Sequence, residues 1–386
     1  MAKLGDIATI QSGGTPARSI AEYWEDGTIP WVKISDIKSK HLNQTEEMIT
    51  EVGLENSSAK IFPKGTILYT IFATLGETSI LDINAATNQA IAGISITDSR
   101  VLPDYLYYYL LSQKIHVQKI GRGVAQNNIN MKLLRDFDVP LPSKEAQLNI
   151  IEQLNRVTEL LFLRKQQLTK LDELIKARFV EMFGDMLLNS LEWPEKPLEG
   201  LADIVSGITK GRKTTETGLI EVPYMAVSNV KSGYIDWTTI KTILATKQEI
   251  EQYRLMPDDI LMTEGGDPDK VGRGAIIKNP LKDSIHQNHI FRVRLDKSEL
   301  LPAYFAEYLQ HQKAKRYFLG CAKQTTGIAS INMRQLRALP VLIPPLPLQN
   351  QFADFVAKVD KSKVEVQKAL DQTQLLFDSL MQQYFG

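Results

Sequence analysis

Hydrophobic and polar positions alternate in short runs over residues 1–142, and the same kind of pattern returns after residue 197. Short apolar runs bounded by turn signals predict strands, and a stretch with helical spacing follows them in each part. The predicted strands are 66–72 and 91–96, then 275–278 and 290–295; the predicted helices lie near 105–119 and 304–318; the turn signals include Ser12-Gly13-Gly14 and Gly265-Gly266. The pattern therefore predicts two compact domains of mixed α and β structure.

A proline-rich segment closes each predicted domain, and a long helical stretch follows it. In both stretches apolar or long side chains recur with alternating steps of four and three, which is the spacing of a coiled-coil seam. The first seam contains Ile150, Leu154, Val157, Leu161, Arg164, Leu168, Leu171, Ile175, Arg178 and Met182. The second contains Phe352, Val356, Val359, Lys363, Val366, Leu370, Thr373, Phe377, Leu380 and Tyr384.

The second half of the chain repeats the first. Leu4-Gly5-Asp6-Ile7 returns as Leu201-Ala202-Asp203-Ile204. From Ile129-Asn130-Met131 against Ile331-Asn332-Met333 onward, the offset is a constant 202 residues without a gap. Such an ordered series indicates duplication, and its long period indicates a two-copy protein rather than a solenoid.

The two matching seams predict that the long helices pair with each other. The alternative is that each helix covers its own domain. At about 1.5 Å per residue each helix is roughly 60 Å long, longer than a domain of this size is wide, and this favours pairing. The expected boundaries are 1–142 for the first domain, 143–196 for the first helix and a linker, 197–344 for the second domain and 345–386 for the second helix.

The composition is that of a soluble globular protein, with 43% hydrophobic and 23% charged residues among 386. No apolar run approaches the roughly 20 residues that span a bilayer, and the opening residues lack a signal-peptide core. The single cysteine, Cys321, excludes an internal disulfide and a multi-cysteine zinc site. We expect a cytoplasmic protein with no membrane partner.

The net charge is zero, with 45 basic and 45 acidic side chains. The segment 197–344 carries 20 basic and 16 acidic side chains, and the remaining segments are close to balance. Any affinity for nucleic acid must therefore come from local basic patches and from a partner, not from overall attraction.

The motifs of several enzyme classes are absent from the sequence. It has no Gly-x-x-x-x-Gly-Lys-Ser/Thr phosphate loop, no Gly-x-Ser-x-Gly nucleophile elbow, and neither the Asn/Asp-Pro-Pro-aromatic nor the Pro-Cys element of DNA methyltransferases. Asp258 followed by Asp269-Lys270 lacks a nuclease spacing, because Pro268 stands where the second carboxylate is needed. We predict a non-catalytic chain.

One histidine pair, His286 and His289, has a spacing that suits a shared metal ion. No third ligand is evident, and the first copy has Thr87 and Ala90 at these positions. The pair is not part of the shared design, and we expect no metal in this chain.

Taken in order, the motifs resemble those of the specificity subunits of type I restriction-modification systems, over nearly the whole chain. The matching segments are LGDIATIQSGGTPAR, IPWVKISDI, GVAQNNIN, LRDFDVPLP and LDELIKARFVEMFGD in copy one, and LADIVSGITKGR, VPYMAVSNV, TTGIASINM, LRALPVLIPPLPLQNQ and LFDSLMQQYFG in copy two. Each segment alone matches the family only weakly, and the order of the segments makes the resemblance specific.

The resemblance implies two target recognition domains, related by a pseudo-twofold axis and separated by an antiparallel two-helix coiled coil. Each domain would read one half of a bipartite, asymmetric site in double-stranded DNA, at a spacing of roughly 60 Å or about 17 base pairs. It also implies two DNA methyltransferase subunits as partners, with restriction and translocase subunits added for cleavage. S-adenosylmethionine, ATP and magnesium would bind to those partners, and no cofactor to this chain.

Loops with amides, cations or carboxamide side chains are the candidates for contact with DNA. In copy one they are Ser12, Gly13, Gly14, Thr15, Arg18, Lys33, Ser35, Asn88, Gln89, Arg122, Gln126, Asn127 and Asn128. In copy two they are Lys210, Arg212, Lys213, Ser228, Asn229, Arg273, Gln287, Asn288, Lys323, Gln324 and Thr325.

The residue types suggest how these loops divide the work. Glutamine and asparagine suit bidentate contact with adenine, whereas the basic cluster 210–213 suits phosphate. In copy one the segment 12–15, together with Arg18, is predicted to place backbone amides and a cation on phosphate. For each residue the alternative is a solvated turn. The frames match between the copies while these loops differ, which favours the reading of two different half-sites.

Two other functions are consistent with parts of the pattern. A scaffold that docks two identical partners without reading DNA would have the same paired helices, and a neighbouring gene for a DNA methyltransferase would distinguish the two. A stand-alone modification enzyme is disfavoured by the missing cofactor and catalytic motifs.

Overall fold

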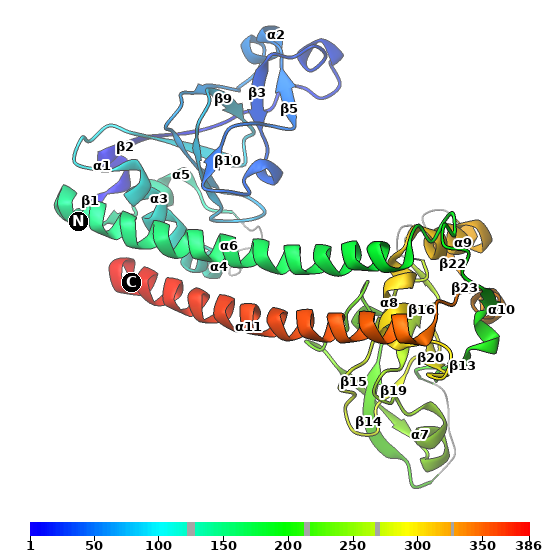
Figure 1. The fold of residues 1–386 in the computed structure, drawn as a ribbon. Coiled ribbons are helices and arrows are strands. Elements are labelled where there is room, and N and C mark those ends of the chain that lie inside the picture. The colour runs from blue at the N-terminus through cyan, green and yellow to red at the C-terminus, as the bar shows by residue number, and fades with distance from the viewer. Residues whose placement is uncertain (122–127, 212–216, 267–270, 326–327) are drawn as a thin grey trace. The chain divides into compact units, whose positions relative to one another are not determined.

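The structure is a computed structural model that describes residues 1–121, 128–211, 217–266, 271–325 and 328–386. The chain divides into two units, of which unit 1 comprises residues 1–165 and 368–386 and unit 2 comprises residues 166–367. Each unit holds one mixed α and β domain together with part of two long helices, α6 (Lys144–Phe183) and α11 (Leu346–Phe385) (Figure 1). The predicted α+β fold class, with two domains and two long helices, is confirmed.

The domain of unit 1 is built from two sheets. In chain order its elements are β1 (Ala2–Lys3), α1 (Leu4–Ile7), β2 (Ala8–Ser12), η1 (Ala21–Tyr23), β3 (Ile29–Val32), η2 (Ile34–Asp36), β4 (His41–Leu42), β5 (Glu47–Ile49), α2 (Glu51–Glu55), β6 (Ile61–Phe62), β7 (Ile67–Thr70), β8 (Thr78–Leu81), β9 (Ala85–Thr87), β10 (Ile91–Ile96), α3 (Pro103–Ser112), α4 (Lys114–Gly121), α5 (Met131–Arg135) and β11 (Asp138–Val139). The sheets have the strand orders β2-β10-β7-β8-β4 and β5-β3-β9-β6, and β1 pairs with β11.

The central strand β7 of unit 1 is apolar over Ile67, Leu68 and Tyr69 because both of its faces are covered. Ile67 and Tyr69 belong to the core that includes helix α3, and Leu68 belongs to the core on the opposite side, with Val32 and Phe62 of the second sheet. All three β7 residues are completely buried. The alternation of side chains along the strand thus builds two cores, one under α3 and one between the sheets.

Unit 2 repeats this arrangement. Its elements are β12 (Glu195–Pro197), η3 (Leu198–Gly200), β13 (Ala202–Ser206), β14 (Ile220–Met225), η4 (Val227–Asn229), β15 (Lys241–Ala245), α7 (Lys247–Tyr253), β16 (Ile260–Thr263), β17 (Gly265–Gly266), β18 (Gly274–Ile276), β19 (Ile285–His286), β20 (Ile290–Leu295), α8 (Pro302–Gln310), α9 (Gln312–Cys321), β21 (Lys323–Thr325), β22 (Ile328–Ser330), α10 (Met333–Arg337) and β23 (Pro340–Leu342). The strand orders are β13-β20-β16-β18, β15-β14-β19, β17-β22-β21 and β12-β23.

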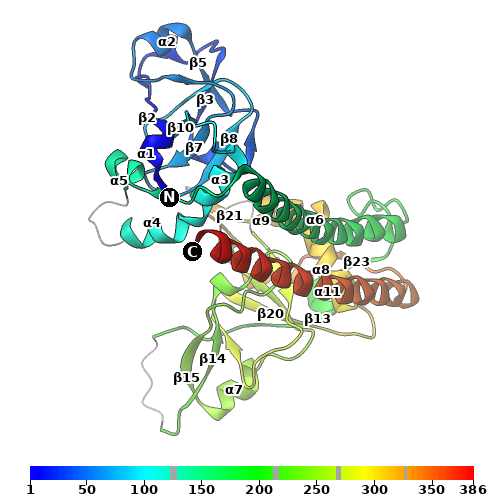
Figure 2. The same cartoon turned by 90° about the vertical axis from the view of Figure 1, so that its left-hand side faces the viewer.

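Helix α3 is enclosed, because it lies between the sheet of unit 1 and the long helices (Figure 2). The hydroxyl of Tyr108 donates to Asn155 Oδ1 of α6 at 2.7 Å. The ring of Tyr105 lies 5.4 Å from that of Phe385 of α11. A helix that is apolar on most of its surface is a helix enclosed by its neighbours.

The two helices predicted near 105–119 and 304–318 are each broken into two, and in this respect the prediction is wrong. Helix α3 ends before Gln113, and α8 ends before His311, whose backbone is extended at φ −80° and ψ 156°. The His311 side chain then accepts from the amide of Lys313 and begins α9. Side-chain capping of this kind competes with continuation of the helix.

The turn predicted at Gly265-Gly266 is also wrong. These residues form strand β17, which pairs antiparallel with β22 at Gly265–Ser330 and Gly266–Ala329. A Cβ on Gly265 would lie 3.0 Å from the carbonyl oxygen of Ala329 in β22. Glycine at position 265 therefore allows two strands to approach closely and does not form a turn.

Candidate nucleic-acid interface

The predicted seam positions face inward on both long helices. Those that are buried are Leu154, Val157, Leu161, Ile175, Phe352, Val359 and Thr373. Those that are half-buried are Ile150, Leu168, Leu171, Val356, Val366, Leu370, Phe377 and Leu380. The long polar members of the seams, Arg164, Arg178 and Lys363, are half-buried as well.

Within unit 2 the end of α6 packs against the beginning of α11. The ring of Phe352 lies 5.4 Å from that of Phe179 and 5.5 Å from that of Phe183. Farther along, Lys363 Nζ donates to Asp172 Oδ1 at 2.5 Å. Residue numbers rise along α11 as those of its partners fall along α6, so the helices are antiparallel in this unit.

Within unit 1 the beginning of α6 meets the end of α11. The hydroxyl of Tyr384 donates to Gln153 Oε1 at 2.7 Å, and Leu154 and Met381 are buried in the same cluster, which also includes the core side chains under the sheet. The two alternatives drawn from the sequence therefore occur together in this unit. The helices contact each other, and both also cover the domain.

Two buried glutamines that sequence reasoning missed attach each long helix to its own domain. Gln147 Oε1 accepts from the amide of Leu102, and its Nε2 donates to Arg100 O and Pro142 O at 2.9 and 3.0 Å. Gln349 makes the same set with Leu301, Glu299 and Pro344. Both side chains are completely buried. The sequence did contain a signal for these residues, because both copies have a glutamine at this position, 202 residues apart.

The glycine-rich loop of copy one does not offer its amides to a phosphate, so this part of the prediction is wrong. The amide of Gly13 donates to Ile91 O at 3.1 Å, and that of Gly14 donates to Thr87 O at 2.8 Å. A Cβ at Gly13 would lie 2.1 Å from Thr87 Oγ1. The glycines allow the loop to pack closely against β9, and Ser12 is the last residue of β2.

Residues at the ends of β3 and β9 do come together, as their positions after apolar strands suggest. The two strands are parallel, with Val32 beside Thr87, so Lys33 and Asn88 follow at neighbouring strand ends. The side chains of Thr15 and Gln89 hydrogen-bond to each other, and Ser35 is exposed. Their role in DNA contact stays a prediction.

The two cations predicted to serve this loop are already paired. Arg18 forms an ion pair with Glu47 at 2.5 Å and lies 3.7 Å above the ring of Trp24. Lys33 pairs with Glu46 and Glu47, each at 2.9 Å, and hydrogen bonds from the ammonium to these carboxylates raise the pKa of Lys33. Both cations thus have carboxylate partners within the domain, and contact of Arg18 with phosphate stays a prediction.

In copy two, Asn229 organises a turn and is not free to read a base. Its Oδ1 accepts from the amide of Ala226, and its Nδ2 donates to Asp236 O and Thr239 O, all at 2.9 Å. The side chain is buried, which corrects the prediction for this residue. The neighbouring Ser228 is exposed at the same turn.

Gln287, Asn288 and Arg273 lie half-buried in the domain of unit 2. Gln287 Oε1 accepts from the amide of Val227 at 3.3 Å, so it borders the turn that Asn229 organises. Asn288 Nδ2 lies 3.4 Å from His289 Nε2. Arg273 stands at the edge of a pocket together with Lys231 and Lys315.

The remaining candidates fall into three groups. Lys210 is exposed, and the backbone of Asn128 bridges to Phe72. Lys323, Gln324 and Thr325 form strand β21, paired with β22, rather than the expected loop. Arg122, Gln126, Asn127, Arg212 and Lys213 lie outside the described residues.

His286 is a buried core side chain. The side chain is completely buried, and its ring makes an edge-to-face contact with the ring of Tyr253. Burial lowers the pKa of the imidazole to about 4. His289 is exposed and hydrogen-bonds to Glu264 at 2.6 Å. Across the described part of the chain, no group of three or more His, Cys, Asp or Glu side chains could hold a metal ion.

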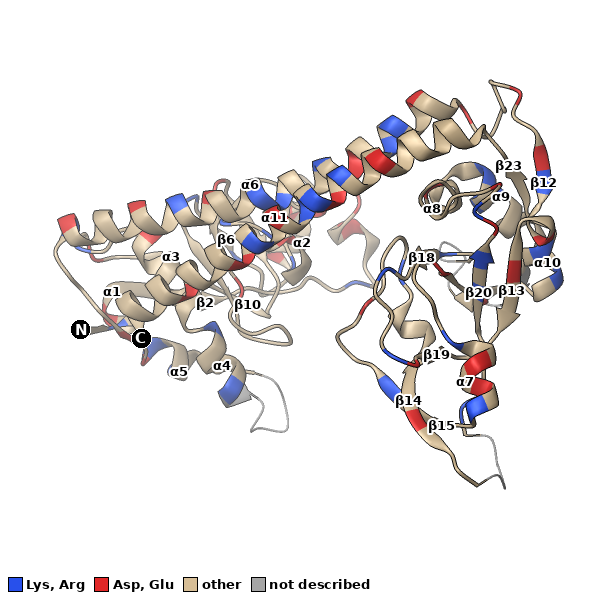
Figure 3. Cartoon of the chain, turned by 60° about the horizontal axis from the view of Figure 1, so that its bottom comes forward, with Lys and Arg blue, Asp and Glu red and all other residues tan. Residues whose placement is uncertain are grey.

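Charges of both signs alternate along α6 and α11 (Figure 3). The helices themselves therefore offer no continuous basic track for a polyanion. Among the described helices, none has the length and apolarity to cross a membrane. The loops of the two domains differ between the copies.

Comparison with known proteins gives a consistent result. The family model described as "Type I restriction modification DNA specificity domain" matches residues 1–173 and 190–373. The specificity subunit of the type I restriction enzyme MjaIX of Methanocaldococcus jannaschii is 25% identical over 401 residues, which cover 98% of this chain and 90% of that protein. The EcoKI specificity subunit of Escherichia coli K12 is 21% identical over 412 residues, covering 100% and 88%.

Solved structures agree in fold. The S subunit of a type I restriction-modification system from M. genitalium matches with a TM-score of 0.54 at 16% identity, covering 100% of this chain and 95% of that one. A chain from a study of complex assembly and conformational transition of a type I system matches with a TM-score of 0.59 at 16% identity, covering 100% and 96%. With its two matched domains, this chain belongs to the family of type I restriction-modification DNA specificity proteins.

Proposed function

We propose that this chain is the non-catalytic specificity subunit of a type I restriction-modification complex, in which each domain reads one half of a bipartite, asymmetric DNA site. The observation that carries the proposal is that the same backbone fold occurs in both domains, while side chains of different charge occupy equivalent positions. The amide of Thr70 donates to Glu77 O at 2.9 Å, and the amide of Thr263 donates to Arg273 O at 3.1 Å. An acid in one copy thus occupies the place of a base in the other.

The long helices support a fixed spacing between the half-sites. Each is 40 residues long, and each begins in one unit and ends in the other. At 1.5 Å per residue each helix measures roughly 60 Å. The buried Gln147 and Gln349 anchor the helix starts to their own domains, so a rotation of a domain about its helix would break the hydrogen bonds of that glutamine.

The outer faces of the helices support docking of two identical partners, which we propose are DNA methyltransferase subunits. Phe162 is 57% exposed and its counterpart Val364 is 65% exposed. Leu174 and its counterpart Leu376 are 46% and 49% exposed. Apolar side chains exposed at equivalent places in both copies offer the same surface twice, as two copies of one partner require.

Catalysis would then belong to the partners. We place S-adenosylmethionine on the methyltransferase subunits, and ATP and magnesium on the restriction and translocase subunits that complete the complex. This chain contributes the choice of DNA site and the geometry that delivers each methyltransferase to its half-site.

Methylation profiling of DNA exposed to the chain with its neighbouring methyltransferase subunit tests the proposal. We expect a bipartite motif with one modified adenine on each strand. A chain in which Arg122, Gln126 and Asn127 are all replaced by alanine should lose one half of that motif and keep the other. A continuous motif, methylation without sequence preference, or unchanged recognition of both halves by the variant would contradict it.

A further inference from the structure

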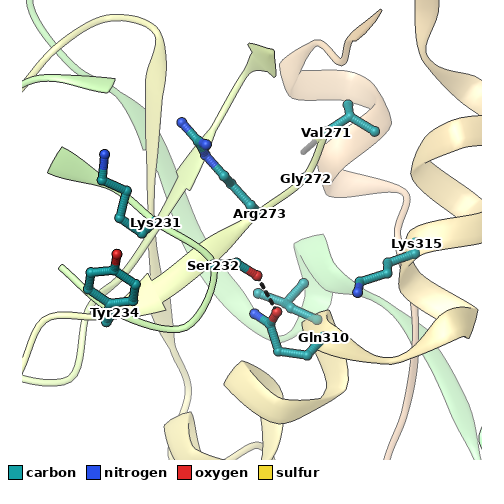
Figure 4. Close-up of a pocket in the computed structure, with 9 residues that line it drawn as sticks. Lys231, Ser232, Tyr234, Val271, Gly272, Arg273, Gln310 and Lys315 are labelled. Carbon is teal, nitrogen blue, oxygen red and sulfur yellow. Dashed lines mark hydrogen bonds between the residues drawn. The ribbon is translucent and has the colours of Figure 1, made fainter. Parts of the chain in front are cut away.

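A basic pocket of about 400 Å³ lies in unit 2. Its walls come from the turn after η4, from the residues that lead into β18, and from helices α8 and α9. Lys231 and Tyr234 stand on one side and Lys315 of α9 on the other, with Arg273 between them (Figure 4). Three cationic side chains therefore line one cavity.

The charges of this pocket are poorly compensated by the described residues. Lys231 has an ion pair with Asp236, but the distance between Nζ and Oδ2 is long, at 3.8 Å. The Nε atom of Arg273 is buried, and among the described residues it has no hydrogen-bond partner. Glu307 faces Lys176, Lys315 and Lys363, and burial raises the pKa of its carboxyl. An anion would supply what the walls lack.

Copy one carries the opposite charge at the position of Arg273. Its equivalent of Arg273 is Glu77, identified by the matching hydrogen bonds from Thr70 and Thr263. The carboxylate of Glu77 pairs with Lys114 at 2.8 Å. Among the described residues of copy two, Arg273 forms no such pair, and this difference points to a ligand.

The walls of the pocket are held in place before any ligand arrives. Ser232 Oγ donates to Gln310 Oε1 at 2.5 Å, and the amide of Gly233 donates to Gly274 O at 3.0 Å. The buried Asn229 fixes the other end of the turn through its bond to Asp236 O. Cations on a fixed frame lose little conformational entropy on binding.

We propose that this pocket receives a backbone phosphate of the DNA half-site that copy two reads. The inference rests on the proposed function. A phosphate is favoured over an acidic protein partner because the pocket adjoins two candidates for DNA contact. The turn that lines the pocket carries Ser228, and the same turn contacts Gln287. The exposed apolar residues of α6 and α11 already provide a different surface for a protein. Tyr234, 60% exposed at the rim, can pack against the adjoining sugar.

Binding of the full chain, assembled with its methyltransferase subunits, to duplexes that contain the methylated motif tests the pocket. Single phosphates in the duplex are replaced in turn by neutral methylphosphonate. The variants are Arg273→Glu, which introduces the copy-one residue, and Lys315→Gln on the exposed face of α9. Lys282→Gln, which removes an exposed lysine outside the pocket, is the matched control.

We expect the unaltered protein to bind more weakly when one or two particular linkages within one half-site are neutral, and the pocket variants to be insensitive to those same linkages. The slope of log affinity against log salt should fall by about 0.9 for each phosphate that the variant no longer neutralises. Lys282→Gln should respond to every linkage as the unaltered protein does. Because Lys315 is exposed, Lys315→Gln keeps the test valid if Arg273→Glu fails to fold.

Two outcomes would overturn the inference, and a third would overturn the proposed function on which it rests. Equal sensitivity of all proteins to every linkage, with parallel salt slopes, would exclude a phosphate here while leaving sequence-specific binding intact. Pocket variants that bind DNA normally but no longer assemble with the methyltransferase would assign the pocket to an acidic protein surface. Absence of any sequence preference in the unaltered protein would instead mean that the proposed function itself has failed.

Discussion

Gln147 and Gln349 are the residues whose chemistry is best defined by their surroundings. The buried carboxamide of each glutamine accepts a hydrogen bond from one backbone amide and donates to two backbone carbonyl oxygens, all in its own unit. A buried polar group without its partner costs more free energy than the bond itself contributes. These side chains therefore determine how each domain is seated on the helix that begins in it.

Replacing Gln349 by alanine should lower the free energy of unfolding by about 2–4 kcal/mol, because one buried and two partly buried backbone groups are left without a partner at once. Gln147→Ala should have a similar effect in unit 1. Urea unfolding followed by circular dichroism measures both. The exposed Gln166→Ala on α6 is the control and should change stability by less than about 0.5 kcal/mol. An effect of Gln349→Ala as small as that of the control would show that water replaces the side chain without cost.

His286 should make the stability depend on pH. Burial lowers its pKa to about 4 in the folded state, whereas the ordinary value is about 6.5. The unfolded chain therefore binds the proton more readily, and stability is lost as pH falls from about 6.5 toward 4. Between pH 7 and pH 5 the free energy of unfolding should fall by about 2 kcal/mol because of this group.

Urea unfolding of the intact chain and of His286→Gln at pH 7 and pH 5 isolates this contribution. The variant should lack the part of the pH dependence that is due to His286, while the exposed His41→Gln should retain it. Identical pH dependence in the intact chain and in His286→Gln would mean that the imidazole becomes protonated without unfolding.

The sequence predicted residue types better than residue roles. Asparagine and arginine suit DNA contact, and this put Asn229 and Arg18 among the candidates. What these side chains actually bind depends on the tertiary fold. Arg18 meets Glu47 and Trp24 across a loop, and Asn229 folds its own turn. Hydrogen-bond partners such as Leu102 for Gln147 are equally invisible in the local pattern.

At the level of elements, the long helices were predictable because a heptad pattern is local. Steps of three and four place the same side of a helix toward its partner over any length. The breaks at Gln113 and His311 were not predictable in this way, because apolar residues continue on both sides of them. Strand β17 was missed because two adjacent glycines usually indicate a turn.

Substitutions on the inner and outer faces of the long helices should separate stability from docking. Phe352 is completely buried against Phe179 and Phe183, so Phe352→Ala should cost about 3–5 kcal/mol. Phe162 is exposed, so Phe162→Ser should leave the free energy of unfolding unchanged within about 0.5 kcal/mol. Urea unfolding of both variants measures the difference, and an equal cost for the two would contradict the assignment of the faces.

The same Phe162→Ser variant should weaken association with the methyltransferase, which analytical ultracentrifugation of the mixed subunits measures. Val364→Ser, the counterpart in the second copy, should do so to a similar degree. The exposed and polar Glu159→Ser serves as the control on the same helix. Full association by both variants would remove the outer faces from the proposed docking surface.

At the level of the whole molecule, duplication is the feature that the sequence revealed most directly. The constant offset of 202 residues relates elements that lie in different units, such as Gln147 with Gln349 and Phe162 with Val364. What duplication alone does not reveal is which loops have diverged for function. The pair Glu77 and Arg273 became visible only when matching hydrogen bonds aligned the two copies.

Exchange of one domain tests most directly whether two reading domains act independently on one scaffold. In this experiment the segment 197–344 is replaced by its counterpart from a specificity subunit that recognises another sequence, and the methylated motif is determined by sequencing. The account predicts that one half of the motif changes while the other half and the spacing between them stay the same. A change in both halves, or in neither, would contradict it.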